Sequence, residues 1–230
     1  VISVDTETTS TDQMRADLVG ISLAISADQG YYIPVGHQPG LGAQLPLADV
    51  IAALKQPLTD PRIKKIGHNL KYDWIVLARH GLQVDPLDFD TMIAEWLINP
   101  TSRNLGLKNL AWVRLNLQMT NIEELIGSGK NQRSMAEVPI PTVAAYAAAD
   151  AVAVFRLMPI LHAALKSNQS ERLIDELEMP LITVLAGMEI AGIALDLSFL
   201  KRMSMELTKR IGEIEQQIFD IIGQSINLNS

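Results

Sequence analysis

The chain has 230 residues, of which 48% are hydrophobic and 20% charged, so it is globular and long enough for one large core or one domain with an extension. It contains no cysteine, which excludes disulfides and thiolate metal sites and suits a reducing cytoplasm. A net charge of -7 argues against a basic nucleic-acid-binding surface. Carboxylates that bind metal ions would count toward this total, however, and bound cations would reverse the local field.

The first half of the chain predicts a small sheet followed by helices. Apolar, β-prone segments at residues 1–5, 18–25 and 31–35 are separated by turn residues, so we expect three consecutive antiparallel strands. Pro34 should then lie at the edge or end of a strand. Further on, the pattern predicts helices at residues 47–58 and 70–78 and, between them, a short strand at residues 63–66.

Helical spacing dominates the second half. Asp90 is placed as the N-cap of a helix that ends at residue 98, and Pro141 suits the first turn of a long Ala-rich helix. The other predicted helices cover residues 105–117, 121–126, 171–191 and 197–222, with a loop at 127–132 and a polar boundary at 166–170. The fold class expected is α/β, with a mixed sheet flanked by helices and followed by a helical extension.

No membrane segment or secretory signal is expected. The most apolar long stretch, residues 179–195, contains Pro180 and Glu189 and reads as a core helix. The chain lacks an initiator Met and opens inside an apparent strand, so we interpret it as a piece of a longer protein.

Two carboxylates follow the first apolar run, at Asp5 and Glu7. Residues two apart on a strand point to the same face, so both acids leave the end of a buried strand together. Like charges in that position repel and are costly to bury unless a cation lies between them. The pattern therefore indicates a divalent metal site.

Two other segments offer the missing ligands. Asp73 lies in the first turn of the helix predicted at 70–78, where a capping role is the alternative explanation. Tyr146 and Asp150 are four residues apart on the Ala-rich helix and share one face. A core tyrosine and an acid at the helix edge is the alternative for this pair.

Taken together, these residues match the requirements of two-metal phosphodiester hydrolysis, in which the ions lie about 4 Å apart. Oxygen ligands suit Mg²⁺ or Mn²⁺, with Zn²⁺ as an alternative. Asp5 and Glu7 would bridge both ions, while Asp150 would complete the shell of one and Asp73 would hold the other. Tyr146 would orient the attacking water.

These spacings resemble the three sequence motifs of the proofreading exonucleases that use four acids and a tyrosine. Their local sequences are similar to the Klenow-type 3′-5′ exonuclease domain of bacterial DNA polymerase I. The resemblance rests on Asp5-Thr6-Glu7-Thr8, Leu18-Val19-Gly20, Asn69-Leu70-Lys71-Tyr72-Asp73, Phe89-Asp90-Thr91-Met92, Gly129-Lys130-Asn131-Gln132 and Tyr146-Ala147-Ala148. It continues into segments that look like the opening of the polymerase domain: Glu178-Met179-Pro180-Leu181, Gly192-Ile193-Ala194-Leu195-Asp196 and Asn227-Leu228-Asn229-Ser230.

The resemblance implies a ribonuclease-H-like exonuclease domain at residues 1–166 and a truncated, helical start of the polymerase domain at 167–230. It implies removal of deoxynucleoside monophosphates from the 3′ end of single-stranded or frayed DNA, with two divalent cations. The expected partners are that DNA end and the polymerase domain of the same parent chain, and no oligomer is expected. The substrate contacts carried over by position are Thr6, Thr8, Thr11, Asn69, Tyr72, Lys130 and Gln132.

Two positions depart from the Klenow enzyme, which has a leucine at the place of Thr11 and a phenylalanine at the place of Ile122. Both changes should reduce stacking on the terminal bases, a contact worth ~1–3 kcal/mol per base. Two alternatives to the exonuclease remain. One is a DNA-positioning module with weak or no catalysis, and the other is a ribonuclease-D-like enzyme that acts on RNA.

Overall fold

The computed structural model describes residues 1–228, apart from the side chain of Asn131. Asn229 and Ser230, the last residues of the polymerase-like ending, lie outside the described residues. The chain forms two compact units, Val1–Ile190 and Ala191–Ser230. The domain limits of 1–166 and 167–230 stay a prediction.

The first unit is built on a mixed five-stranded sheet with the order β3-β2-β1-β4-β5. Its strands are β1 (Ile2–Thr8), β2 (Leu18–Ala24), β3 (Gly30–Pro34), β4 (Lys65–Gly67) and β5 (Leu87–Asp90). The predicted antiparallel order of β1, β2 and β3 is confirmed, and Pro34 ends the edge strand as expected. β4 runs parallel to β1, and β5, which was not predicted, runs parallel to β4.

The helices of the first unit agree with the predicted segments to within a few residues. They are α1 (Leu47–Thr59), α2 (Leu70–Arg79), α3 (Thr91–Ile98), α4 (Leu107–Leu115), α5 (Ile122–Ile126), α6 (Ile140–Ser167), α7 (Glu171–Leu173) and α8 (Met179–Ala191). A π-helical segment, Ile174–Glu178, joins α7 to α8, so the predicted helix at 171–191 is present with an altered turn. Short 3₁₀ turns cover Gly129–Asn131 and Met135–Glu137.

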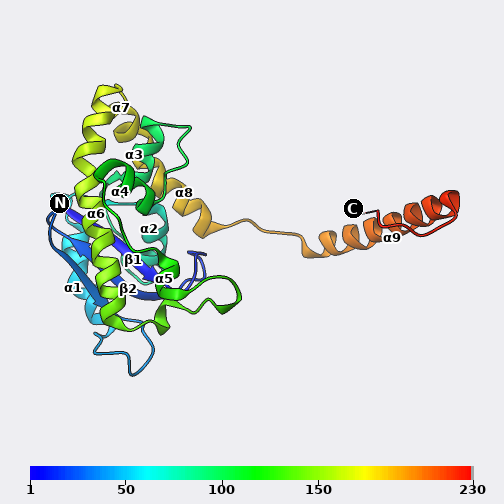
Figure 1. Cartoon of the computed structure of the whole chain (residues 1–230), viewed down its shortest axis with the longest axis horizontal. Coiled ribbons are helices and arrows are strands. Elements are labelled where there is room, and N and C mark those ends of the chain that lie inside the picture. Colours follow the sequence, from blue (N-terminus) through cyan, green and yellow to red (C-terminus); the bar gives the residue numbers. More distant parts are fainter. Residues whose placement is uncertain (229–230) are drawn as a thin grey trace. The chain divides into compact units, whose positions relative to one another are not determined.

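The sheet is covered on both faces. Apolar residues of β1 and β2 pack against α1 and α2 on one face. The long helix α6 crosses the other face and contacts four of the strands (Figure 1). The acids that follow Val4 on β1 therefore leave the sheet between α2 on one side and α6 on the other.

The small residues of α6 allow it to approach the sheet closely. A Cβ atom at Gly30 would come within 2.4 Å of the Ala148 carbonyl oxygen, so β3 and α6 fit only with glycine there. In the part of the chain that is described, α6 is the helix long and apolar enough to cross a membrane. Its buried face packs on the sheet, as expected for the core helix of a globular unit.

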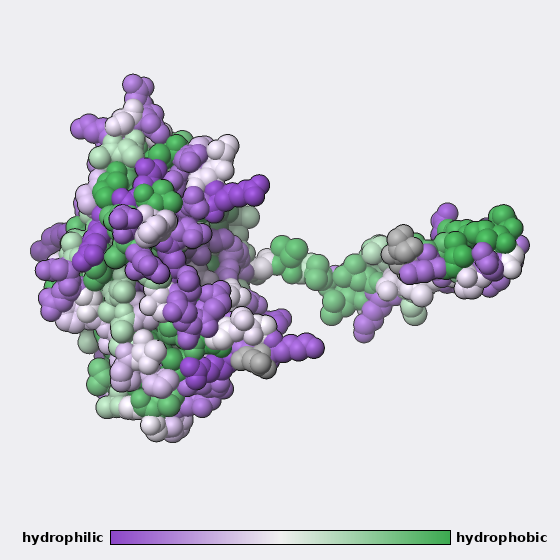
Figure 2. All heavy atoms as spheres, in the orientation of Figure 1, coloured by the Kyte–Doolittle hydropathy of each residue, from purple (hydrophilic) through white to green (hydrophobic). Residues whose placement is uncertain are grey.

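The core of the first unit continues past residue 166. Ile174, Met179 and Ile182 are buried in the same cluster as Leu161 and Leu165 of α6. The second unit contains α9 (Leu197–Ile222), which has the predicted limits and no buried residue. Apolar side chains are exposed along this helix (Figure 2).

Candidate active site

Strand β1 delivers its side chains alternately to the two sides of the site. Val4 belongs to the core on the α2 face, so Asp5 and Glu7 point to the α6 face and Thr6 points toward α2. The Thr6 hydroxyl donates to Asp73 Oδ1 at 2.6 Å, which ties α2 to β1. On the α6 side, the charge of Asp150 acts on both Asp5 and Glu7. The structure therefore brings Asp5, Glu7, Asp73 and Asp150 together.

Burial and mutual repulsion raise the pKa values of the β1 acids. The pKa of Asp5 rises to about 7, mainly through burial and then through the Asp150 charge. The pKa of Glu7 rises well above its usual value for the same first reason, with the charges of Asp5 and Asp150 added. Burial and the Asp5 charge likewise raise the pKa of Asp73 well above its usual value.

The α6 residues carry the same electrostatic strain. Burial raises the pKa of Asp150, although Lys108 opposes that rise. Burial and the Asp150 charge raise the pKa of Tyr146, so its phenol keeps its proton at neutral pH. A protonated phenol next to a carboxylate can donate a hydrogen bond but cannot serve as a base.

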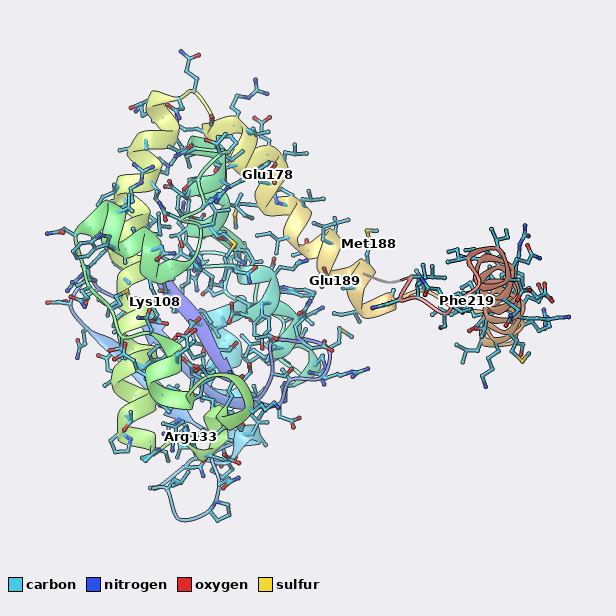
Figure 3. The ribbon with its side chains drawn as sticks, turned by 45° about the vertical axis from the view of Figure 1, so that its right-hand side comes forward. Lys108, Arg133, Glu178, Met188, Glu189 and Phe219 are labelled. Atoms are coloured by element: carbon cyan, nitrogen blue, oxygen red, sulfur yellow. The ribbon has the colours of Figure 1, made fainter. Side chains whose placement is uncertain are left out.

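Lys108 of α4 was not found from the sequence. Figure 3 labels this lysine. Its ammonium pairs with Asp150 Oδ1 and lies 4.0 Å from the centroid of the Tyr146 ring. Ser22 of β2 was also missed, and its hydroxyl donates to Asp5 Oδ2 at 3.0 Å. Neither residue lies in a local pattern with the acids, because each comes from an element that meets them only after folding.

Asp90 was predicted as the N-cap of a helix, and its carboxylate does accept from the Met92 and Ile93 amides at the start of α3. The same carboxylate also accepts from the Asn69 amide at 3.1 Å and the Leu70 amide at 2.7 Å. Asn69 has the left-handed backbone, with φ of 60°. Asp90 therefore holds the turn from which α2 presents Asn69 and Asp73.

Asp5, Glu7 and Asp150 line a cleft of about 690 Å³, and Asp73 is buried outside its lining. Of the expected substrate contacts, Lys130 is exposed on the 127–132 loop and is absent from the cleft lining. The two departures from the Klenow pattern, Thr11 and Ile122, both line the cleft. So do Thr6, Thr8, Asn69, Tyr72 and Gln132, joined by Arg133, Ser134 and Met135, which were not predicted.

The wall of the cleft is held by short polar contacts. The Tyr72 hydroxyl contacts the Thr8 hydroxyl and donates to the Ser10 carbonyl. Thr8 also donates to the Ser10 carbonyl, at 3.0 Å. These contacts fix the chain that follows β1 against α2, so the side chains of Thr8 and Tyr72 have defined positions on the wall.

The donor set fits hard divalent cations. All four acids offer oxygen ligands, and each of their pKa values is raised, so a cation between them would relieve repulsion and desolvation. Within residues 1–228, no three acidic or histidine side chains stand in the arrangement of a preformed metal cage. Lys108 engages Oδ1 of Asp150 and Thr6 engages Oδ1 of Asp73, so a cation that binds through either of these oxygens would compete with that contact.

Comparison with known proteins decides the family. A family model described as 3′-5′ exonuclease matches residues 1–166. The chain belongs to this 3′-5′ exonuclease family. DNA polymerase I of Chloroflexus aurantiacus is 42% identical to it over 98% of this chain and 24% of its own length. DNA polymerase I of Pseudomonas aeruginosa is 34% identical over 100% of this chain and 26% of its own length. This exonuclease-family chain thus spans about a quarter of the length of these relatives, and the expected resemblance to bacterial DNA polymerase I is confirmed.

Solved structures agree with the family. The POL domain of Pol1 from M. smegmatis, in complex with DNA primer-template and dNTP, has a TM-score of 0.78 and 26% identity, covering 100% of this chain and 35% of its own. Brucella melitensis NrnC with bound Mg²⁺ has a TM-score of 0.64 and 22% identity, covering 83% of this chain and 85% of its own. The second likeness concerns the fold alone. The expected ribonuclease-H-like fold, a mixed sheet flanked by helices, is confirmed for the exonuclease-family chain.

Proposed function

We propose that the chain is the proofreading 3′-5′ exodeoxyribonuclease module of a DNA polymerase I. It would hydrolyse the last phosphodiester of single-stranded or frayed DNA and release a deoxynucleoside monophosphate. The observation that carries the proposal is the convergence of Asp5, Glu7, Asp73 and Asp150, each with a raised pKa, beside one open cleft. We expect a cytoplasmic location, as for a replication and repair enzyme.

Asp5, Glu7, Asp73 and Asp150 would hold two divalent cations, Mg²⁺ or Mn²⁺. When bound, such a pair of ions activates a water and stabilises the charge on the leaving oxygen. Ser22 keeps one oxygen of Asp5 hydrogen-bonded and so orients that carboxylate. Tyr146, which stays protonated, would orient the attacking water by a hydrogen bond from α6.

The rest of the cleft would hold the DNA end. Asn69 sits at its rim in a strained backbone conformation fixed by Asp90, and Tyr72 forms part of its wall. Thr11 is shorter than the leucine of the Klenow pattern, and Ile122 lacks the aromatic ring of its phenylalanine. They should therefore hold the terminal base by apolar contact and contribute little stacking.

Hydrolysis of an oligodeoxynucleotide in Mn²⁺ tests the proposal. The wild-type chain should shorten a 5′-labelled single strand one nucleotide at a time from its 3′ end and release mononucleotides. Asp5→Ala should slow this at least about a thousandfold, since loss of a bridging ligand removes several kcal/mol of transition-state stabilisation. Asp28→Ala, at an exposed acid far along the chain from the site residues, is the matched control and should keep full activity.

Three outcomes would contradict the proposal. Full activity of Asp5→Ala, with a circular dichroism spectrum like that of the wild type, would show that Asp5 takes no part in the hydrolysis. Binding of the strand without cleavage by the wild type would favour the DNA-positioning module, and cleavage of RNA in place of DNA would favour the ribonuclease-D-like enzyme.

A further inference from the structure

Lys108 occupies a position that its own helix does not favour. α4 begins at Leu107 after Gly106, so Lys108 lies in the first turn of the helix. A cation there opposes the helix macrodipole and is unfavourable. The contact that offsets this cost is the ion pair with Asp150, in which the lysine side chain is 21% exposed and the carboxylate 10%. The position of Lys108 is therefore favourable for its contact with Asp150 and unfavourable for helix α4 itself.

The ion pair uses the carboxylate that the proposed function assigns to a metal ion. Lys108 binds Asp150 Oδ1 and also lies over the Tyr146 ring. An ammonium and a divalent cation cannot share one carboxylate oxygen at contact distance, because their charges repel. Cation binding at Asp150, even through the second carboxylate oxygen, therefore weakens the ion pair with Lys108.

His68, which follows β4, offers a second place for the displaced ammonium. Thr91 donates its hydroxyl proton to the Gly67 carbonyl at 3.1 Å, so the 2.8 Å contact between Thr91 Oγ1 and His68 Nδ1 requires the imidazole to donate from Nδ1. Nε2 is then left with a bare lone pair. Among the described residues, His68 Nε2 is a buried polar atom without a hydrogen-bond partner.

Lys108 is the charged neighbour of this imidazole. Burial and, to a smaller extent, the Lys108 ammonium together lower the pKa of His68 to about 4, so the ring is neutral and can only accept at Nε2. A buried acceptor without a donor is destabilising, because it has lost its hydrogen bonds to water. A lysine side chain has three donor hydrogens and four rotatable bonds, so it can supply the missing donor.

We propose that Lys108 is a mobile positioning residue that pairs with Asp150 until a divalent cation binds there and then moves to donate to His68 Nε2. The inference rests on the proposed function, because it concerns the same metal-binding carboxylate. In this arrangement Lys108 competes with the cation, and Asp150 is not left as an unpaired buried charge between cycles. Metal affinity is then set partly by the ease with which Lys108 leaves.

Calorimetric titration with Mn²⁺ alone tests the competition. Lys108→Met keeps the length of the side chain and removes its charge, so it should bind Mn²⁺ about tenfold more tightly than the wild type. Lys64→Met is the matched control. It removes a lysine that pairs with Asp88 and not with any of the four site acids, so it should bind Mn²⁺ as the wild type does.

Nitrogen-15 NMR of His68 in the wild type tests the second position directly, with Lys108→Met as the comparison. On addition of Mg²⁺ the Nε2 resonance of the wild type should move upfield as the lone pair accepts a hydrogen bond, and in Lys108→Met it should stay. An unchanged His68 resonance in the wild type, or equal Mn²⁺ affinity of the wild type and Lys108→Met, would overturn the inference alone. Absence of Mn²⁺ binding by the wild type would overturn the proposed function as well.

Discussion

At the scale of single residues, the site stores unfavourable electrostatics. Asp5 is half-buried and Glu7 buried, and they lie side by side on β1 with raised pKa values. Such groups lower the stability of the folded chain whenever they are ionised without a cation. A bound divalent cation would relieve this cost, so the acids support the metal-dependent activity proposed above.

The raised pKa of Asp5 predicts how stability depends on pH. The unfolded chain loses this proton near its usual pKa of 3.8, while the folded chain keeps it up to about 7. The folded state binds more protons in that window, so this group makes metal-free stability fall as the pH rises, by at most ~1.4 kcal/mol per pH unit. Asp5→Asn, melted in EDTA, should lose less stability between pH 5 and pH 8 than the wild type and melt about 5 °C higher at pH 8.

The control for this effect is Asp28→Asn, an exposed acid that should reproduce the pH dependence of the wild type. Identical melting curves for Asp5→Asn and the wild type at pH 8 would show that Asp5 carries no strain. Added Mg²⁺ should raise the melting temperature of the wild type most at high pH and leave that of Asp5→Asn nearly unchanged.

Ile122 is the second residue-scale test, because it is 39% exposed on the cleft wall. Ile122→Phe supplies a ring on which a terminal base can stack, so single-stranded DNA should bind about tenfold more tightly. Ile122→Leu keeps an apolar side chain but has no aromatic ring, so it should bind single-stranded DNA as the wild type does. Fluorescence anisotropy in Ca²⁺ measures this affinity. If Ile122→Phe binds no more tightly than the wild type, the DNA end lies elsewhere.

The sequence was informative about residues that share a short spacing. Asp5 and Glu7 on one strand, and Tyr146 and Asp150 on one helix, could be paired from periodicity alone. The relation of Lys108 to Asp150 and His68 could not be found in this way, because it exists only once α4 meets α6 and the end of β4. The placement of Lys130 outside the cleft lining was likewise beyond the sequence, since a loop residue's direction depends on backbone angles that a motif does not specify.

At the scale of elements, most limits followed from caps and periodicity, and β5 was the exception. Its residues, Leu-Asp-Phe-Asp, alternate over only four positions directly after Pro86, which gives too short a pattern to recognise. The strand forms because β4 offers it a parallel partner and because Phe89 is buried in the α6 core. Tertiary packing, and not local propensity, determines this element.

Asp90, at the end of β5, gives the element-scale prediction. Its buried carboxylate accepts amide hydrogens from both α2 and α3, so Asp90→Ala should lower the free energy of unfolding by about 3 kcal/mol in urea. Hydrolysis should fall as well, because the same contacts place Asn69 and Asp73. Asp88→Ala, two residues earlier and partly exposed, is the control and should change stability by less than about 1 kcal/mol. A stable, active Asp90→Ala would show that α2 needs no such anchor.

At the scale of the whole molecule, the core of the first unit extends past the end of the family match. The match ends at residue 166, but Ile174, Met179 and Ile182 complete the cluster around the C-terminal half of α6. Glu189 of α8, labelled in Figure 3, also accepts a hydrogen bond from the Gln13 side chain. That bond measures 2.7 Å and reaches the chain that follows β1. The segment after residue 166 therefore contributes to the stability of the unit that holds the site.

Truncation tests this contribution. Burying three large apolar side chains contributes about 5 kcal/mol, which is comparable to the total stability of a typical domain. The fragment 1–166 should therefore aggregate or melt far below the full chain, while 1–190 should melt close to it. Thermal melting and size-exclusion chromatography of both fragments measure the difference. A fragment 1–166 as stable as 1–190 would show that α8 is dispensable.

The central claim is that four acids hold paired cations at the cleft. Anomalous diffraction from crystals soaked with Mn²⁺ and a deoxynucleoside monophosphate tests it most directly. Two peaks about 4 Å apart are predicted, both bound by Asp5 or Glu7, with Asp150 on one and Asp73 on the other. Manganese bound away from these carboxylates, or no peak beside Asp5 at saturating metal, would contradict the account.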